Sequence, residues 1–405
     1  MSYEVRACAS AAEVRLAVRP IWHYFGRLAP VDELTDRTTR VIAPDRVFGA
    51  WEDGRAVGGA GAWAFDLTIP GGRIPAAGVT AVGVLPTHRR RGILRAMMRA
   101  QLDDCRRRGE SVAYLWATDD AIYGRFGYGM ASVSGEIDVA REHAAYRAPL
   151  RSSGSARLVP VAEAEPVVAP IWERVSQVTP GMFTRTPEWW RARTLFDLDS
   201  RRRGFPDLCC SVVDLGAGPV AYALYRFQFG IDRGISTGTV DVIEAMGDSP
   251  DATAAIWRHL FDMDWSARIK ARCLPLDHPL FLLLAEPRWL RFNVRDGLWV
   301  RLVDVGAALS ARGYAAPGAV AIELTDAFCP WNAGTWRIGD GGAARTTAAP
   351  ELRCDVADLG AVYLGGFSWS QLARALRVEE LRPGAVERAD ALFRSAVAPW
   401  CPEIF

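Results

Sequence analysis

The sequence predicts a mixed α/β protein of several domains, and three observations support this prediction. Short runs of β-branched and aromatic residues alternate with amphipathic helical segments. The length of 405 residues corresponds to roughly two to four domains of ~100–200 residues each. The composition is that of a globular chain, with 50% hydrophobic and 23% charged residues, so each domain can bury a core of its own.

The N-terminal third predicts alternating strands and helices. Strands are expected where β-branched and aromatic residues gather, at Tyr3–Ala9, Val47–Glu52, Gly58–Thr68, Val79–Leu85 and Val112–Thr118. Apolar residues three and four apart predict helices over Ala11–Phe25 and Gly92–Arg108. Gly109 is the expected C-cap of the second helix. Gly71–Pro75 predicts a turn, and Asp119–Phe126 predicts a short helix before a glycine-rich turn.

The remaining two thirds repeat the α/β order. A serine- and glycine-rich stretch at residues 151–155 predicts a linker. The elements expected after it are strands at Leu208–Asp214, Pro219–Phe229, Gly238–Ala245, Leu298–Asp304, Ala319–Thr325 and Gly334–Ile338, and helices at Val167–Val178, Pro250–Met263, Ser368–Ala375 and Pro383–Phe393. We therefore expect three domains, at residues 1–150, 151–288 and 289–405.

Charge and hydropathy patterns exclude several classes of protein. The 48 basic and 47 acidic residues leave a net charge of +1, which argues against a general nucleic-acid-binding protein. No apolar run reaches the ~18 residues of a membrane span, and the N-terminus lacks the apolar core of a signal peptide. We expect a cytoplasmic protein.

Metal and lysine chemistry are also unexpected. The eight cysteines are scattered without a C-x-x-C pair, and the five histidines stand apart, so we expect neither a disulfide scaffold nor a metal site. Lys270 is the only lysine, which argues against catalysis through a Schiff base.

The clearest chemical signal is the segment Val82–Leu94. A strand leads into the basic loop Thr-His-Arg-Arg-Arg-Gly, and the loop opens a long helix. The first amides of a helix have no internal partner, and the helix dipole favours an anion beside them. Gly92 allows a close backbone approach. These features suit a pyrophosphate, although neither the Walker pattern nor the G-x-G-x-x-G pattern is present.

The loop resembles the acetyl-CoA loop of the GNAT acetyltransferases, whose usual pattern is R/Q-x-x-G-x-G/A. Arg89–Leu94 matches it except at Leu94, where a small residue is usual. In GNAT enzymes a later segment often supplies a tyrosine near the thioester sulfur, and Tyr123 or Tyr128 can do so here. A tyrosine with a pKa near ~10 is protonated at neutral pH and can give its proton to a thiolate. Alternatively, both rings are packing residues.

Taken together, the strings Pro86–Gly92 and Ile122–Gly129 resemble the Eis (enhanced intracellular survival) family of N-acetyltransferases, and the resemblance extends over the chain. It implies tandem GNAT-like domains, the second without a cofactor site, followed by a domain similar to sterol carrier protein. It also implies an acetyl-CoA co-substrate, Tyr123 as general acid and the C-terminal carboxylate of Phe405 as general base. The implied cofactor contacts are Val82, Gly83, Val84, Arg90, Arg91, Gly92, Ile93, Leu94, Arg95, Thr118 and Asp119.

The resemblance further implies direct acetyl transfer to the primary amine of a cationic substrate, such as an aminoglycoside, a polyamine or a peptide lysine. It also implies a homo-oligomer, and specifically a hexamer. The residue before Phe405 is Ile404 instead of an acidic one, so Glu403 is a candidate substitute. The other residues expected at an amine pocket are the acidic Asp32, Glu33 and Asp36 and the aromatic Trp22, Phe25 and Trp63.

Two alternatives stay open. One is a related N-acyltransferase with a single dedicated amine substrate. The other is a non-enzymatic protein that binds a lipid or another ligand in its C-terminal region.

Overall fold

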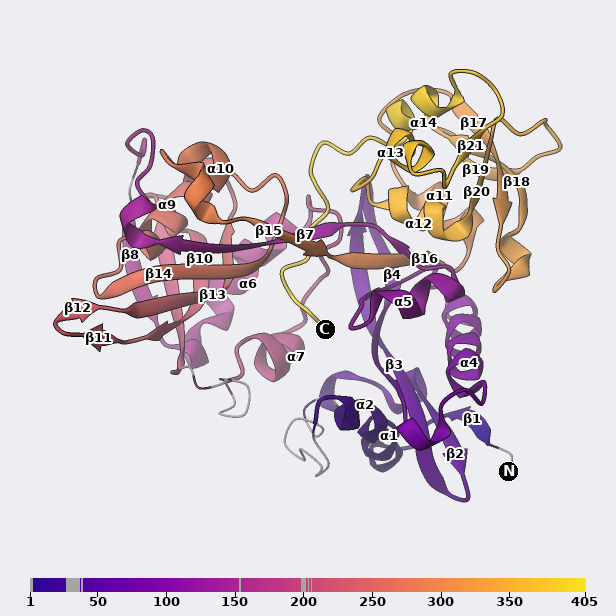
Figure 1. The fold of residues 1–405 in the computed structure, drawn as a ribbon, viewed down its shortest axis with the longest axis horizontal. Helices are drawn as coiled ribbons and strands as arrows, with labels where there is room; N and C mark the ends of the chain where they lie inside the picture. The colour runs from indigo at the N-terminus through magenta and orange to yellow at the C-terminus, as the bar shows by residue number, and fades with distance from the viewer. Residues whose placement is uncertain are drawn as a thin grey trace. The chain divides into compact units, whose positions relative to one another are not determined.

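A computed structural model describes residues 3–26, 37, 39–152, 154–197, 202, 204 and 206–405. The chain forms two compact units (Figure 1). The first unit contains Met1–Ser132, Leu298–Pro399 and Phe405. The second contains Val133–Gly297 and Trp400–Ile404.

The first unit is built on a seven-stranded mixed sheet. Its order is β1-β2-β3-β4-β5-β16-β6. The bounds are β1 Glu4–Ala7, β2 Val47–Glu52, β3 Arg55–Ile69, β4 Gly72–Val84, β5 Val112–Trp116, β16 Leu298–Leu302 and β6 Gly129–Met130. The helix α4 (Ile93–Arg107) links the parallel strands β4 and β5 and buries Met97, Met98 and Leu102. The strands and the helix expected from the sequence are present here.

Two local expectations for this unit are wrong. The predicted helix Ala11–Phe25 is two helices, α1 (Ala11–Ala17) and α2 (Arg19–Tyr24). Pro20 cannot donate an amide inside a continuous helix, and it stands instead in the first turn of α2. The predicted turn Gly71–Pro75 belongs mostly to β4, because the β3–β4 pairing extends to Ile69 and Gly72. The long hairpin tolerates Pro75 opposite Asp66.

A second, five-stranded sheet completes the first unit. Its order is β19-β18-β17-β20-β21. Its strands are β17 Ala319–Thr325, β18 Gly334–Gly339, β19 Gly342–Arg345, β20 Leu352–Asp355 and β21 Glu379–Glu380, and its helices are α11 Val305–Ala311, α12 Val356–Tyr363, α13 Trp369–Arg374 and α14 Ala385–Phe393. All eight residues of α12 are buried. A Cβ on Gly129 would overlap the Ala357 carbonyl, so β6 and α12 need this glycine to meet.

The second unit has its own seven-stranded sheet, in the order β15-β7-β14-β13-β10-β9-β8. The strands are β7 Val133–Ala140, β8 Ser155–Val159, β9 Leu208–Asp214, β10 Pro219–Gln228, β13 Gly238–Gly247, β14 Ser266–Leu274 and β15 Asn293–Asp296. The helices α6 (Glu165–Ser176) and α9 (Pro250–Phe261) pack on this sheet. Trp257, Leu260 and Ile269 lie in its buried core. The short hairpin β11–β12 joins Ile231–Asp232 to Ile235–Ser236.

The chain passes between the two large sheets twice, once at β7 and once at β16. β7 follows the first unit's β6 in the chain but pairs with β14 and β15 of the second unit. β16 follows β15 in the chain but pairs with β5 and β6 of the first unit. Each sheet is therefore completed by a strand that adjoins the other in sequence. The sequence did not predict β7, β14 or β15.

The second unit contains a buried histidine, His278, from which we expect a stability that depends on pH. His278 is 5% exposed and packs edge-on against Trp257. Burial lowers the pKa of His278 to about 3, from an ordinary value near ~6.5. Between these values the unfolded chain binds a proton that the folded unit does not. The free energy of unfolding should therefore fall by up to about 1.4 kcal/mol per pH unit as the pH drops below 6.5.

Urea denaturation of wild type and His278→Asn at pH 7 and pH 5 checks this expectation. Asn keeps an acceptor for the Leu280 amide, which bonds to His278 Nδ1 at 3.3 Å. The variant should lose less stability than wild type on acidification, and His23→Asn, at an exposed position, should behave like wild type. Identical pH dependence in His278→Asn and wild type would contradict the expectation.

Within the described parts of the chain, every helix is too short or too polar to cross a bilayer.

Candidate active site where β4 and β5 diverge

The central feature of the first sheet is a fork between two parallel strands. β4 and β5 pair only at Ala76–Gly78 with Val112–Tyr114. Beyond Gly78, β4 stays paired with β3 as far as Val84 but has no ladder to β5. Ala81 has a φ of 53°, beside a register shift between β3 and β4. This bulge bends β4, and the backbone groups of its free edge can bind a ligand.

The loop after β4 forms a concave set of amides. Arg90 has a φ of 62° and Gly92 a φ of 83°, so two left-handed residues flank Arg91. Such alternation turns successive amides toward one point, where an anion can bind. Gly92 is the N-cap of α4 and offers no side-chain acceptor. The first amides of this 15-residue helix are therefore left for an external acceptor.

Two of the three loop arginines, Arg91 and Arg89, fix the loop through contacts with residues outside it. Arg91 forms an ion pair with Glu52 at 2.5 Å, and His88 Nε2 lies 2.9 Å from the same carboxylate. The Arg91 hydrogen bond, with a smaller contribution from His88, lowers the pKa of Glu52 to about 2 despite partial desolvation. The pair is therefore ionised at neutral pH.

Arg89 is held by a different partner. Its Nε donates to the Tyr24 hydroxyl at 2.5 Å, and its guanidinium stacks on that ring at 4.6 Å. The Tyr24 hydroxyl donates to the Val84 carbonyl at 2.7 Å. Arg90 is exposed, and no described residue forms a hydrogen bond or ion pair with its side chain. Arg90 is thus the loop arginine best placed for an external anion.

The other predicted cofactor contacts divide into interior and exposed residues. Ile93 is 1% exposed, so only its backbone can meet a ligand. A Cβ on Gly83 would lie 2.9 Å from the Ile21 Cα, so this glycine lets α2 pack on β4. Val82 and Leu94 are half-buried beside the apolar cluster under α4, and Arg95 stacks over Phe328 at 5.1 Å. Thr118 and Asp119 are exposed just after β5.

Tyr123 lies at the end of α5 (Asp120–Tyr123) and borders the fork on the α4 face of the sheet. Its ring belongs to the cluster that contains Val79 and Leu115, one residue beyond the last paired positions of β4 and β5. Burial, with a smaller contribution from Asp119, raises the pKa of Tyr123 to about 12. Tyr123 is therefore a neutral proton donor at physiological pH.

Tyr128 packs edge-on against Tyr123, with ring centroids 5.7 Å apart. It is fully buried, and its hydroxyl has no hydrogen-bond partner among the described residues. Tyr123 keeps 8% of its surface exposed, so of the two tyrosines it is the better placed to meet a substrate.

Phe405 borders the fork on the opposite face. Its ring lies 5.0 Å from that of Tyr114 and 5.2 Å from that of Phe65. A Cβ on Gly78 would lie 3.2 Å from the Phe405 ring. Gly78 and Tyr114 are the last paired residues of β4 and β5. Side chains alternate between the faces of a sheet, so Tyr123 beside Leu115 and Phe405 beside Tyr114 flank the fork from its two sides.

The structure describes three of the other six residues predicted at an amine pocket, and these three differ in exposure. Asp32, Glu33 and Asp36 lie outside the described residues. Trp63 is a core residue, 2% exposed, whereas Trp22 is half-buried and Phe25 is 50% exposed.

Glu403 is not a free acidic group. In the second unit its carboxylate pairs with Arg185 at 2.7 Å and accepts from Trp189 Nε1 at 3.0 Å. Arg185 is fully buried between this carboxylate and Glu244, at 2.6 Å. The negative charge of Glu403 is therefore balanced within the second unit, and its place at an amine pocket stays a prediction.

The histidine, cysteine and acidic side chains of the described residues are dispersed. They hold no group of three or more histidine, cysteine or acidic side chains suited to a metal ion. All eight cysteines are free thiols.

Comparison with known proteins identifies the domains and the family of the chain. Residues 10–131 and residues 181–302 each match an acetyltransferase (GNAT) domain, and residues 305–402 match a sterol carrier protein domain. The N-acetyltransferase Eis of Mycobacterium tuberculosis is 36% identical over 349 residues, which cover 82% of this chain and 81% of that protein. The chain belongs to the Eis family of GNAT N-acetyltransferases.

Another relative and a solved structure agree with this assignment. An uncharacterized N-acetyltransferase of Streptomyces avermitilis is 43% identical over 388 residues, 94% of each chain. The structure of Eis1 from Mycobacterium abscessus aligns with a TM-score of 0.86 at 36% identity, covering 99% of this chain and 100% of that one. The Eis fold of two GNAT domains followed by a sterol-carrier-like domain, predicted from the sequence, is confirmed, as is an acetyltransferase enzyme.

Proposed function

We propose that this Eis-family enzyme moves an acetyl group from acetyl-CoA to the primary amine of a cationic substrate by direct attack. The observation that carries the proposal is the fork between β4 and β5, with Tyr123 on one face and Phe405 on the other. A thioester in the fork would have a proton donor beside its sulfur and a carboxylate on the side from which an amine arrives.

The co-substrate is expected to follow the free edge of β4. Its pyrophosphate would bind the first amides of α4 and the Arg90 side chain. Its pantetheine arm would bind the backbone of Val82, Gly83 and Val84. An amide of Val82 or Val84 would donate to the acetyl carbonyl and stabilise the oxyanion that forms during attack.

The cationic amine must lose two protons, and the CoA sulfur must gain one. The Phe405 carboxylate takes the first proton, directly or through water, and the neutral nitrogen bonds to the acetyl carbon. The carbon–sulfur bond then breaks, Tyr123 protonates the CoA thiolate, and the second proton released by the nitrogen restores the Tyr123 hydroxyl through water. No acetyl-enzyme forms in this scheme. A free C-terminal carboxylate has a pKa near ~3.5, so part of its effect is electrostatic attraction of the cationic amine.

The substitution Arg90→Ala should raise the KM for acetyl-CoA by about tenfold and leave kcat within about twofold. The guanidinium would contact the phosphates, which do not react, so it contributes equally to ground-state and transition-state binding. Initial rates at two ionic strengths measure this, and the effect should shrink as salt screens the charge.

Arg374→Ala, an exposed arginine on α13, is the matched control and should change neither constant. An unchanged KM in Arg90→Ala would place the pyrophosphate elsewhere.

The deciding experiment for the function measures thiol release from acetyl-CoA with aminoglycosides, polyamines, lysine peptides and a neutral monoamine control. Release that depends on a cationic amine supports the proposal. Release with a single amine, or only with a longer acyl-CoA, would favour the dedicated N-acyltransferase. No release from folded protein, together with bound lipid, would favour a binding protein.

The hexamer and the cytoplasmic location also remain predictions, and light scattering at several protein concentrations tests the hexamer.

A further inference from the structure

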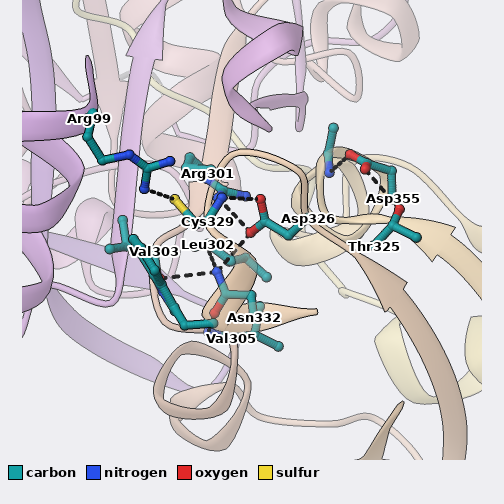
Figure 2. Close-up of polar contacts among 12 residues, drawn as sticks. Arg99, Arg301, Leu302, Val303, Val305, Thr325, Asp326, Cys329, Asn332 and Asp355 are labelled. Carbon is teal, nitrogen blue, oxygen red and sulfur yellow. Dashed lines mark hydrogen bonds and ion pairs between the residues drawn. The ribbon is translucent and has the colours of Figure 1, made fainter. Parts of the chain in front are cut away.

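Arg301 and Asp326 form a buried ion pair (Figure 2). Arg301 on β16 is fully buried, and its Nη2 donates to Asp326 Oδ2 at 2.6 Å. Every second residue along β16 and just beyond it faces the same side of the sheet, and these residues include Trp299, Arg301 and Val303. Trp299 and Val303 belong to the same apolar cluster as Tyr123. The guanidinium therefore enters a hydrophobic cluster on the face where the proposed acid lies.

Asp326 is fixed by contacts within the sterol-carrier-like region. Its Oδ1 accepts from the Cys329 amide at 2.8 Å, and its Oδ2 accepts from Asn332 Nδ2 at 3.0 Å. Asn332 Nδ2 also donates to the Val303 carbonyl at 3.2 Å, one residue past the end of β16 (Figure 2). These bonds fix Asp326, and the ion pair in turn fixes the Arg301 guanidinium.

The Arg301 guanidinium packs against the turn between Tyr123 and Tyr128. A Cβ on Gly127 would overlap Arg301 Nη1, and Gly127 has a φ of 81°. Both facts require glycine at this position. Phe126, the preceding residue, packs on Phe328 at 5.1 Å. The turn from Tyr123 to Tyr128 therefore rests on Arg301 from β16 and on Phe328 from the sterol-carrier-like region.

Stability alone gives a weak reason for this arrangement. Replacing a buried ion pair by apolar side chains of similar size is often neutral or stabilising, because desolvation offsets the attraction. Here Nε and Nη1 of Arg301 have no hydrogen-bond partner among the described residues, which adds to that cost. A planar group held by a fixed carboxylate does give the turn above it a defined position.

We propose that Arg301, held by Asp326, is a positioning residue that places the Tyr123 hydroxyl for proton transfer to the leaving thiolate. The sterol-carrier-like region thereby serves acetyl transfer, since it supplies Asp326 and Phe328. The inference rests on the proposed function, and specifically on Tyr123 as the acid. A small displacement of a catalytic group by a distant change can cost ~10²-fold in rate.

The test uses the full-length double variant Arg301→Met/Asp326→Asn, which removes both charges together and keeps an acceptor for the Cys329 amide. We expect kcat to fall about tenfold or more, with the KM for acetyl-CoA unchanged, because neither residue touches the co-substrate. In a Tyr123→Phe background the same double change should lower kcat less than twofold, because Arg301 acts through the Tyr123 hydroxyl.

The matched control is Arg312→Met in the same unit. Arg312 is also buried, but it donates to the carbonyls of Tyr363 and, at 2.5 Å, Phe393. Its loss should lower the melting temperature and leave kcat within twofold. If the double variant does not fold, Arg301→Lys keeps the charge and loses the planar fork. It should then show the same fall in kcat at unchanged KM, and the same loss of effect beside Tyr123→Phe.

Two results would overturn the inference: a wild-type kcat in the folded variant, or an undiminished effect of the variant in the Tyr123→Phe background. A fully active Tyr123→Phe would instead remove the acid assignment in the proposed function. The two failures are therefore distinguishable.

Discussion

Tyr123→Phe should lower kcat by about 10²- to 10⁴-fold, the range that general acid catalysis contributes. The change removes one hydroxyl from a ring that is otherwise held in the cluster under α4. Without this proton donor the CoA sulfur must leave as an unprotonated thiolate or take its proton from water. Binding of acetyl-CoA, measured by calorimetry, should be unchanged, because the hydroxyl acts only as the carbon–sulfur bond breaks.

The pH profile provides a second readout for Tyr123. Its pKa is raised to about 12, so the hydroxyl stays protonated throughout the range in which the enzyme is assayed. Wild-type kcat should therefore not decline between pH 7 and pH 10 through loss of this proton.

Tyr128→Phe is the matched control for Tyr123→Phe. It deletes the same group from the neighbouring ring, whose hydroxyl has no partner among the described residues, and kcat should stay within about twofold. Equal losses in the two variants would indicate that the tyrosines act as a packing pair, and full activity in Tyr123→Phe would end its assignment as the acid.

Appending one glycine after Phe405 should reduce kcat/KM for the amine by about 10²-fold or more. The ring can stay between Phe65 and Tyr114, while the terminal carboxylate moves by about 3.8 Å, one residue along the chain. The proposed base and the attraction for the cationic amine are both displaced. Steady-state rates over a range of amine concentrations measure the loss.

Ile404→Ala is the control for the added glycine, because Ile404 is 61% exposed and its loss leaves the carboxylate in place. It should retain wild-type kcat/KM. A fully active extended variant would show that the carboxylate of Phe405 is not the base, while leaving the fork and Tyr123 unaffected.

Local patterns predict the parts of this protein that depend on local structure. The strand, basic loop and helix from Val82 to Arg107 lie where the sequence places them, because hydrophobic spacing and glycine act over a few residues. The roles of the individual arginines were not predictable. Arg91 pairs with Glu52 and Arg89 with Tyr24, and both partners are distant in sequence.

Contacts between residues distant in sequence also explain which other features the sequence did not predict. β7 leaves the first sheet for the second, and β16 returns, a choice that no run of β-branched residues reveals. The pairing of Glu403 with Arg185 was not predictable, because Arg185 lies more than two hundred residues earlier in the chain. Arg301 and Asp326 carry no motif, and only the packing of two regions makes them neighbours. An arginine within the apolar run Leu298–Leu302 was the available signal.

The exchange of strands has a consequence for synthesis. A chain leaving the ribosome presents β5 long before β16 exists to cover its edge, and Phe405 joins the fork later still. At ~5–20 residues per second the delay lasts roughly tens of seconds. The second sheet has all of its strands before β16 emerges. We therefore expect the sheet of the first unit, although its first five strands are made first, to be completed last, and the nascent chain to need protection of an open sheet edge until then.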